Sequence, residues 1–230
     1  MEMIRNVVWQ ALTSEHAPLA LGGVAARRYP ADVVPFAALR ESAPAAMREL
    51  AALLAMDEVL YVAWSEDAGP PPVVEELAVV GAISALQMAP AVNTVSALET
   101  DPRIESLTAA NAPEMVALTD VAFPGFFRPR TYRMGRYWGI REGGELIAMA
   151  GERLAVPGAR EISAVCTHPA HTGRGYASKL VRHVMRQHRE DGLQSFLHVS
   201  DFNARAIGIY EQLGFVPLGA TQLTQVRRVW

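Results

Sequence analysis

The chain has 230 residues, of which 50% are hydrophobic and 20% charged, and its net charge is -3. This content supplies a core for one large domain or two small ones, and the slightly acidic balance argues against nucleic acid and membrane surfaces as partners. A single cysteine excludes an internal disulfide and a cysteine-rich metal site, and the sequence has neither an apolar run of about 18 residues nor a signal peptide pattern. We therefore expect a cytoplasmic, globular protein that acts on small molecules, without metal.

The first part of the chain predicts a short helix, a strand, a helix and two further strands. The helix begins near Trp9, and the first strand spans residues 36–39. A helix over 44–56 follows, for which Ser42 is the expected N-cap. Runs of apolar residues predict strands over 59–64 and 77–86, since a loop rich in glycine and proline separates them.

The same order of elements recurs after residue 101. The pattern predicts a strand over 104–108, a helix over 113–121, and a hairpin of 137–140 with 146–153 around Gly143 and Gly144. The recurrence suggests two related units, a degenerate one at 1–100 and a complete one at 101–230. Residues 90–100 have no strong periodicity and are the expected linker.

A strand, a turn with two glycines and a helix follow one another between residues 161 and 191. The strand spans 162–167, and the helix is indicated by apolar residues spaced three and four apart from Ala177 onward. The first amides of a helix lack intrahelical acceptors, and Gly173 and Gly175 let a ligand approach them closely. This turn predicts a site for a pyrophosphate.

Two motifs in this order resemble the GNAT superfamily of N-acetyltransferases. Thr172-Gly-Arg-Gly-Tyr-Ala177 resembles the family's Arg/Gln-x-x-Gly-x-Gly/Ala signature, with Thr at its first position. Asn203-Ala-Arg-Ala-Ile-Gly-Ile-Tyr210-Glu-Gln-Leu-Gly-Phe215 resembles its Asn-x-x-Ala-x-x-x-Tyr-x-x-x-Gly-Phe segment. The resemblance implies an α/β (α+β) fold whose mixed central sheet is splayed at the acetyl-CoA site. The implied cofactor is acetyl-CoA, and the implied reaction is acetyl transfer to an amine.

The resemblance also implies which residues contact coenzyme A. The expected set consists of the strand residues that pair with the pantetheine arm, the turn that holds the pyrophosphate, and three positions of the second motif: Val165, Cys166, Thr167, Thr172, Gly173, Arg174, Gly175, Tyr176, Ala177, Ser178, Asn203, Ala206 and Tyr210. Tyr210 would donate its proton or a hydrogen bond to the sulfur of the leaving thiolate. Cys166 contributes its backbone, because a lone cysteine in an apolar strand is a packing residue rather than a nucleophile.

The acceptor amine must lose a proton, and three routes are open. Glu161 precedes Gly175 by 14 positions (175 minus 161), a spacing that resembles the glutamate base of one branch of the family. Glu152 on the preceding strand is the second candidate, and a water relay is the third. The histidines form no spacing typical of a metal site, so no metal is expected.

The segment 122–136 falls where the family has its acceptor-binding loop. Arg128 and Arg130 could hold an acceptor carboxylate, and Phe126 and Phe127 could wall the pocket. The arginines could equally pair with acids elsewhere in the fold. The sequence thus predicts an acetyltransferase, monomeric or homodimeric, for a small-molecule amine or an amino-acid-like acceptor. The alternatives are a non-catalytic acyl-CoA sensor and a protein N-acetyltransferase.

Overall fold

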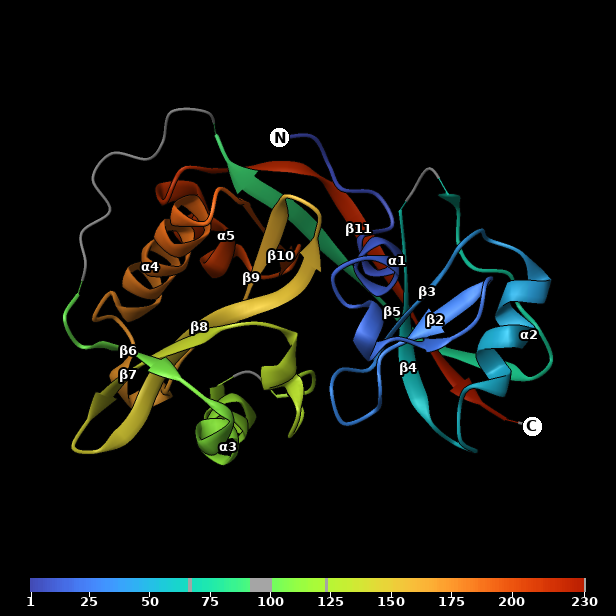
Figure 1. Ribbon diagram of the computed structural model, residues 1–230, viewed down its shortest axis with the longest axis horizontal. Coiled ribbons are helices and arrows are strands. Elements are labelled where there is room, and N and C mark those ends of the chain that lie inside the picture. The colour runs from blue at the N-terminus through green and yellow to red at the C-terminus, as the bar shows by residue number, and fades with distance from the viewer. Residues whose placement is uncertain (66–67, 92–100, 123, 230) are drawn as a thin grey trace.

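One mixed sheet collects strands from both halves of the chain. The computed structural model describes residues 1–65, 68–91, 101–122 and 124–229. Its strands are β1 (Leu21–Gly22), β2 (Ala26–Arg28), β3 (Phe36–Leu39), β4 (Val59–Ser65), β5 (Leu77–Pro90), β6 (Ile104–Leu107), β7 (Tyr137–Glu142), β8 (Glu145–Val156), β9 (Ala159–Thr167), β10 (Gln194–Ser200) and β11 (Phe215–Arg228). They are ordered β1-β2-β3-β4-β11-β5-β10-β9-β8-β7-β6 (Figure 1).

Helices cover both faces of this sheet. They are α1 (Val7–Thr13), α2 (Pro44–Ala52), α3 (Ala112–Ala122), α4 (Tyr176–Glu190) and α5 (Ala204–Gln212). Neighbouring residues of β7 show that α3 and α4 lie on opposite faces, because Tyr137 packs with the core of α3 and Trp138 with that of α4. Alternation along a strand therefore decides which side chains of β8 and β9 meet which helix. The mixed α/β class expected from the sequence is confirmed.

The centre of the sheet joins segments that are far apart in the sequence. β5 lies between β10 and β11, and β11 pairs with β4 on its other side, so the two long strands cross the middle of the molecule together (Figure 1). Their pairing extends from Phe215 opposite Pro90 to Arg228 opposite Leu77. Strands from the two units expected from the sequence are thus paired in one continuous sheet.

Most expected elements form where their patterns predict them. The hairpin of β7 and β8 turns at Gly143 and Gly144, and α4 begins directly after Gly175. The N-cap expected at Ser42 is wrong, because Ala43 occupies that position and the Ser42 hydroxyl donates to the Pro70 carbonyl instead. Of the expected linker, residues 92–100 lie outside the described residues. No helix in the described ranges is long and apolar enough to cross a membrane.

Gly151 on β8 lies against the ring of Tyr137 on β7. A methyl group at this position would overlap that ring, which is itself buried. We expect Gly151→Ala to lower the free energy of unfolding by about 1–3 kcal/mol, the usual cost of overpacking a core. Gly208→Ala is the matched control, because no heavy atom lies within 4 Å of its added Cβ and helical alanine is favoured over glycine. Denaturant titration of both variants would contradict this account if Gly151→Ala were no less stable than the control.

Candidate active site

The glycine turn before α4 presents unpaired backbone amides. Gly173 and Gly175 adopt φ angles of 80° and 75°, a region that side chains disfavour. No heavy atom lies within 4 Å of the Cβ that either glycine lacks, so the space above the turn is open. Lys179 N is the first helix amide bonded back into the turn, to Gly175 O at 3.1 Å. None of the hydrogen bonds found among the described residues uses the amides of 173–178, so these amides are available to an anion.

The side chains of the turn are occupied with local contacts. Thr172 Oγ1 donates to Pro169 O at 3.1 Å, and Arg174 forms an ion pair with Glu142 at 3.0 Å. Tyr176 is buried beneath the turn, and Ala177 and Ser178 continue the first helical turn. An anion bound at this turn would therefore be held by backbone amides, for which the Thr at the first motif position is not needed.

Strands β9 and β10 part beyond Ile162. Their parallel pairing ends at Leu197 opposite Ile162, and β9 then bulges at Ala164, whose φ is 51°. Val165 lines the cavity that opens there. Cys166 and Thr167 pair with β8 on the other side, and burial raises the pKa of the Cys166 thiol to about 12, in keeping with a packing role. The β10 side of 163–167 is left unpaired, as a strand-like ligand would need.

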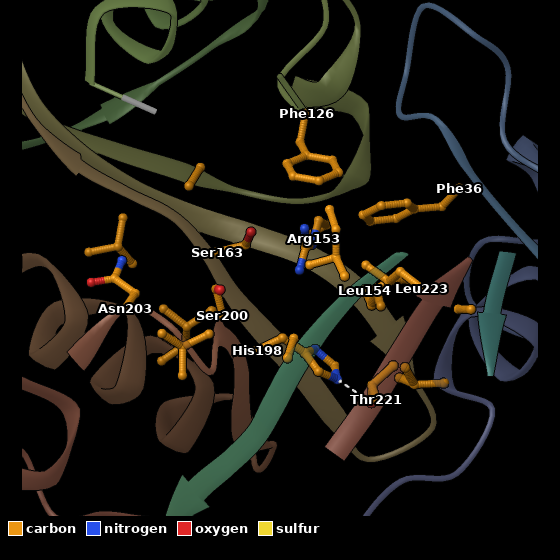
Figure 2. A pocket seen from close by; sticks show the side chains of 18 of the residues that line it. Phe36, Phe126, Arg153, Leu154, Ser163, His198, Ser200, Asn203, Thr221 and Leu223 are labelled. Carbon is orange, nitrogen blue, oxygen red and sulfur yellow. Dashed lines mark hydrogen bonds between the residues drawn. The ribbon is translucent and has the colours of Figure 1, made fainter. Parts of the chain in front are cut away.

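A cavity of about 200 Å³ extends from this gap to the N-terminal half (Figure 2). Its walls come from both halves of the chain and are mostly apolar: Val7, Val8, Phe36, Ala63, Ile83, Ala85, Phe126, Leu154, Ile162, Ala164, Val165, Val199, Ala206, Tyr210 and Leu223. The polar side chains on its wall are Arg153, Ser163, His198, Ser200, Asn203 and Thr221. No Asp or Glu is among the described residues that line it.

The second motif contributes one end of this cavity. Asn203 caps α5, since its Oδ1 accepts from Ala206 N at 3.0 Å, and both residues line the wall. Tyr210 is nearly buried, and burial raises the pKa of its hydroxyl to about 12. None of the hydrogen bonds found within the described ranges uses that hydroxyl. It therefore stays protonated at neutral pH and is free to donate to a ligand.

Glu161 is buried in a hydrogen-bonded network beneath the cavity. Its carboxylate accepts from Arg153 Nε at 2.9 Å and Nη2 at 2.5 Å, from Leu154 N at 3.1 Å and from His198 Nδ1 at 2.7 Å. Burial disfavours its charge, but Arg153 and His198 outweigh burial and hold the pKa of Glu161 well below its usual range. A carboxylate stabilised in this way is a poor proton acceptor.

Gln87 determines which ring nitrogen of His198 accepts a hydrogen bond. The amide of Gln87 is oriented by Ile4, whose N donates to Gln87 Oε1 at 2.6 Å and whose O accepts from Nε2 at 3.2 Å. Gln87 Nε2 must therefore donate to His198 Nε2, which lies 3.1 Å away. The ring proton is then on Nδ1, from which it is donated to Glu161. Both ring nitrogens of His198 are thus engaged within the network.

The structure does not bring Glu152 to the cavity. Glu152 precedes Arg153 and faces α4, where Nε2 of His188 lies 3.3 Å from its Oε1 and Arg136 pairs with it at 2.7 Å. Burial opposes its charge, but these contacts prevail and lower the pKa of Glu152 to about 2. Its place and its pairing both fit a structural ion pair.

The expected acceptor loop supplies one wall residue. Phe126 lines the cavity beside Phe36, with ring centroids 5.6 Å apart, whereas Phe127 packs edge-on against Tyr137 in the core below. Arg130 pairs with Asp32 on the surface at 2.9 Å. Neither Arg130 nor Arg128 is among the cavity residues.

Arg153, His198 and Gln87 were missed as functional residues by the sequence analysis. They lie on β8, β10 and β5, and only the strand order brings them together. One signal was present in the sequence, since Arg153 and His198 interrupt apolar strand segments where a charged or polar side chain needs a partner.

Glu161→Gln is expected to destabilise the protein, because it leaves the buried Arg153 without its counter-charge. We expect a loss of about 3–5 kcal/mol at pH 7. The pKa of Glu161 is depressed by folding, so its stabilisation is present above the unfolded pKa of about 4.3 and fades as pH falls below it. The gap between wild type and variant should therefore narrow in acid.

Urea titrations at pH 7 and pH 3.5 would measure this gap, with Asp32→Asn as the control. Asp32 also pairs with an arginine, but both partners are about half exposed, so its loss should cost no more than about 1 kcal/mol. Equal costs for the two variants at pH 7 would show that the Arg153–Glu161 pair contributes no more than a surface pair.

Comparison with known proteins agrees with the fold. The family described as FR47-like protein matches residues 137–223. A proposed GNAT-family acetyltransferase from Novosphingobium aromaticivorans is 35% identical over 97% of both chains, with a TM-score of 0.86. The chain belongs to the GNAT family of acetyltransferases.

More distant structures share the fold. A GCN5-related N-acetyltransferase from Kribbella flavida is 20% identical over 98% of this chain and 95% of its own, with a TM-score of 0.65. A GCN5-related N-acetyltransferase-like protein from Streptococcus suis is 11% identical over 96% and 92%, with a TM-score of 0.58. The comparison with curated proteins found no match. These findings confirm the predicted superfamily and fold, and they support an acyltransferase.

Proposed function

We propose that the protein transfers the acetyl group of acetyl-CoA directly to the amine of a small, amino-acid-like acceptor. The observation that carries this proposal is the cavity itself, which continues from the gap between β9 and β10 to walls contributed by the N-terminal half. A cofactor in the gap and an acceptor at the N-terminal end would lie in one continuous space, as direct transfer requires.

Coenzyme A fits the residues that are present. The open space above Gly173 and Gly175 and the free amides of 173–178 suit its pyrophosphate, and the unpaired edge of 163–167 suits its pantetheine arm. Acetyl-CoA would supply an activated acetyl group as a thioester. The chain would supply the cradle, the alignment along β9 and a hydrogen-bond donor.

Tyr210 is the proposed donor to the leaving sulfur. Tyr210 lines the cavity, its hydroxyl carries its proton at neutral pH, and none of the hydrogen bonds found among the described residues uses that hydroxyl. A donor that gains its acceptor only as negative charge develops stabilises the transition state more than the ground state.

The proton of the amine is proposed to leave through water. Glu161 has both oxygens engaged, Glu152 faces the other side of the sheet, and no acidic side chain lines the described cavity wall. The rate should then depend on the fraction of acceptor already neutral. For two acceptors whose amines differ in pKa, the midpoints of the pH profiles of kcat/KM should differ in the same direction. Identical midpoints would indicate a base on the protein.

An acetyl-CoA turnover screen against amines, amino acids and N-terminal peptides tests the activity, with release of free thiol as the measurement. Transfer to small amines or amino acids is the expected result. Transfer only to peptides would favour a protein N-acetyltransferase. The lack of an acidic side chain on the described cavity wall argues against that alternative. Binding of coenzyme A without any turnover would favour a sensor. The Tyr210 hydroxyl, which is available as a donor to the leaving sulfur, argues against that alternative.

The division into units at 1–100 and 101–230 is part of the proposal. It is supported by the repeated order of strand, helix, strand and strand, seen as β3, α2, β4 and β5 and again as β6, α3, β7 and β8. In this arrangement the N-terminal unit contributes β5 to the catalytic sheet, and its residues line the acceptor end of the cavity.

A further inference from the structure

We propose that Arg153 anchors the carboxylate of an apolar amino acid, whose side chain occupies the aromatic end of the cavity. This inference rests on the proposed function, because it names the acceptor class for the same site. It also assigns a role to the network around Glu161, which holds the anchor in place.

Arg153 offers a donor to the cavity while its other donors are fixed. Nε and Nη2 are bonded to Glu161, and Nη1 has no hydrogen bond among those found within the described ranges. The guanidinium also lies over the ring of Phe36, 5.1 Å from the centroid. Figure 2 shows it in the middle of the pocket, between Phe36 and Ser163. A guanidinium held on one side by a carboxylate and open on the other suits a second anion.

The anchor is rigid because its partners are themselves held. Glu161 accepts from His198, His198 accepts from Gln87, and Gln87 is fixed by the backbone of Ile4. This chain crosses β5, β10 and β9 below the cavity. A side chain that is already ordered loses little entropy when a ligand binds.

The surroundings of Arg153 indicate an apolar body on the acceptor. Phe36, Phe126 and Tyr61 form an aromatic cluster, with centroids of Phe126 and Tyr61 5.1 Å apart. Val7, Val8 and Leu223 complete this end of the wall. A cavity of about 200 Å³ has room for one side chain of moderate size beside the reacting groups. The low polarity here also strengthens the pairing of Arg153 with an anion.

The position of Arg153 suits an amine close to the carboxylate. On β8, Gly151 pairs with Ser163 of β9, so Arg153 lies beside the stretch where β9 leaves β10. An acceptor whose carboxylate meets Arg153 would place its amine near that gap. The described wall contains one arginine and no acid, and this disfavours polyamines and lysine side chains as acceptors.

Phenylalanine and phenethylamine provide the test, because they differ only in the carboxylate. The double variant Arg153→Met/Glu161→Gln removes both charges of the pair together, so that neither is left without its partner. Circular dichroism would verify its fold. In wild type, kcat/KM should favour phenylalanine by about 10-fold or more, the effect expected of a hydrogen bond to a charged group. The ratio of the two kcat/KM values should fall by a similar factor in the double variant. Arg48→Met, on the exposed face of α2, is the control for loss of an arginine.

Calorimetry of phenylalanine binding to the protein loaded with coenzyme A gives a readout without turnover. The dissociation constant should rise about 10-fold or more in the double variant. Turnover of amines without discrimination in wild type would overturn this inference and leave the proposed function standing. Binding of phenylalanine that depends on Arg153, without any turnover, would support the anchor and overturn the proposed function. Loss of discrimination in Arg130→Met, with the double variant unaffected, would assign the carboxylate to the loop and overturn the proposal.

Discussion

Gly175→Asp is expected to abolish binding of coenzyme A. The space above Gly175 is open and lies at the start of α4, so a carboxylate at this position would occupy the proposed anion site and repel the pyrophosphate. We expect no detectable heat of binding in calorimetry, with a fold unchanged by circular dichroism.

Gly175→Asn is the matched control, since it has the same shape without the charge. Both side chains tolerate the left-handed φ of 75° better than other residues do, so the backbone cost is shared. Weakened but measurable binding is expected for the control. Full affinity in a folded Gly175→Asp protein would mean that the pyrophosphate binds elsewhere.

Tyr210→Phe is expected to lower kcat by about 10²-fold or more, the lower range for general acid catalysis. The affinity for acetyl-CoA should change little, because the hydroxyl acts mainly on charge that develops at the sulfur. Stability should also be retained, since the Tyr210 hydroxyl is in none of the hydrogen bonds found among the described residues.

Tyr29→Phe should behave in the opposite way. The Tyr29 hydroxyl lies 2.8 Å from His16 Nδ1 in the buried N-terminal core, so its removal leaves a buried nitrogen unpaired. We expect a loss of about 1–3 kcal/mol in stability and an unchanged kcat. Normal kinetics for Tyr210→Phe would remove Tyr210 from the mechanism.

The parts of the site that are local in sequence could be predicted from it. The turn at Gly173 and Gly175 needs only two glycines before an amphipathic helix, and the hairpin at Gly143 and Gly144 needs only a turn between apolar strands. In each case the residues that decide the structure lie within a few positions of one another.

The acceptor end could not be predicted in the same way. Arg153 and Phe36 are separated by more than a hundred positions, and their contact depends on the order in which the strands pair. The loop arginines were plausible anchors because an unpaired arginine looks the same in a sequence as a paired one. Arg130 forms an ion pair with Asp32, which lies 98 positions away in the sequence. Glu161 has the spacing of a base, yet its partners on β8 and β10 make it a counter-ion of Arg153.

The position of β11 between β4 and β5 bears on how the protein folds. Synthesis proceeds from the N-terminus, so β4 is made long before β11, the strand that covers its edge. Val62 on β4, for example, can pair only after Thr224 on β11 has been made. Contacts between such distant residues slow folding, and an uncovered strand edge invites pairing with other chains. The glycine turn before α4, in contrast, is formed by residues that are close together in the sequence. The newly made chain is therefore most vulnerable to aggregation in the interval before β11 arrives.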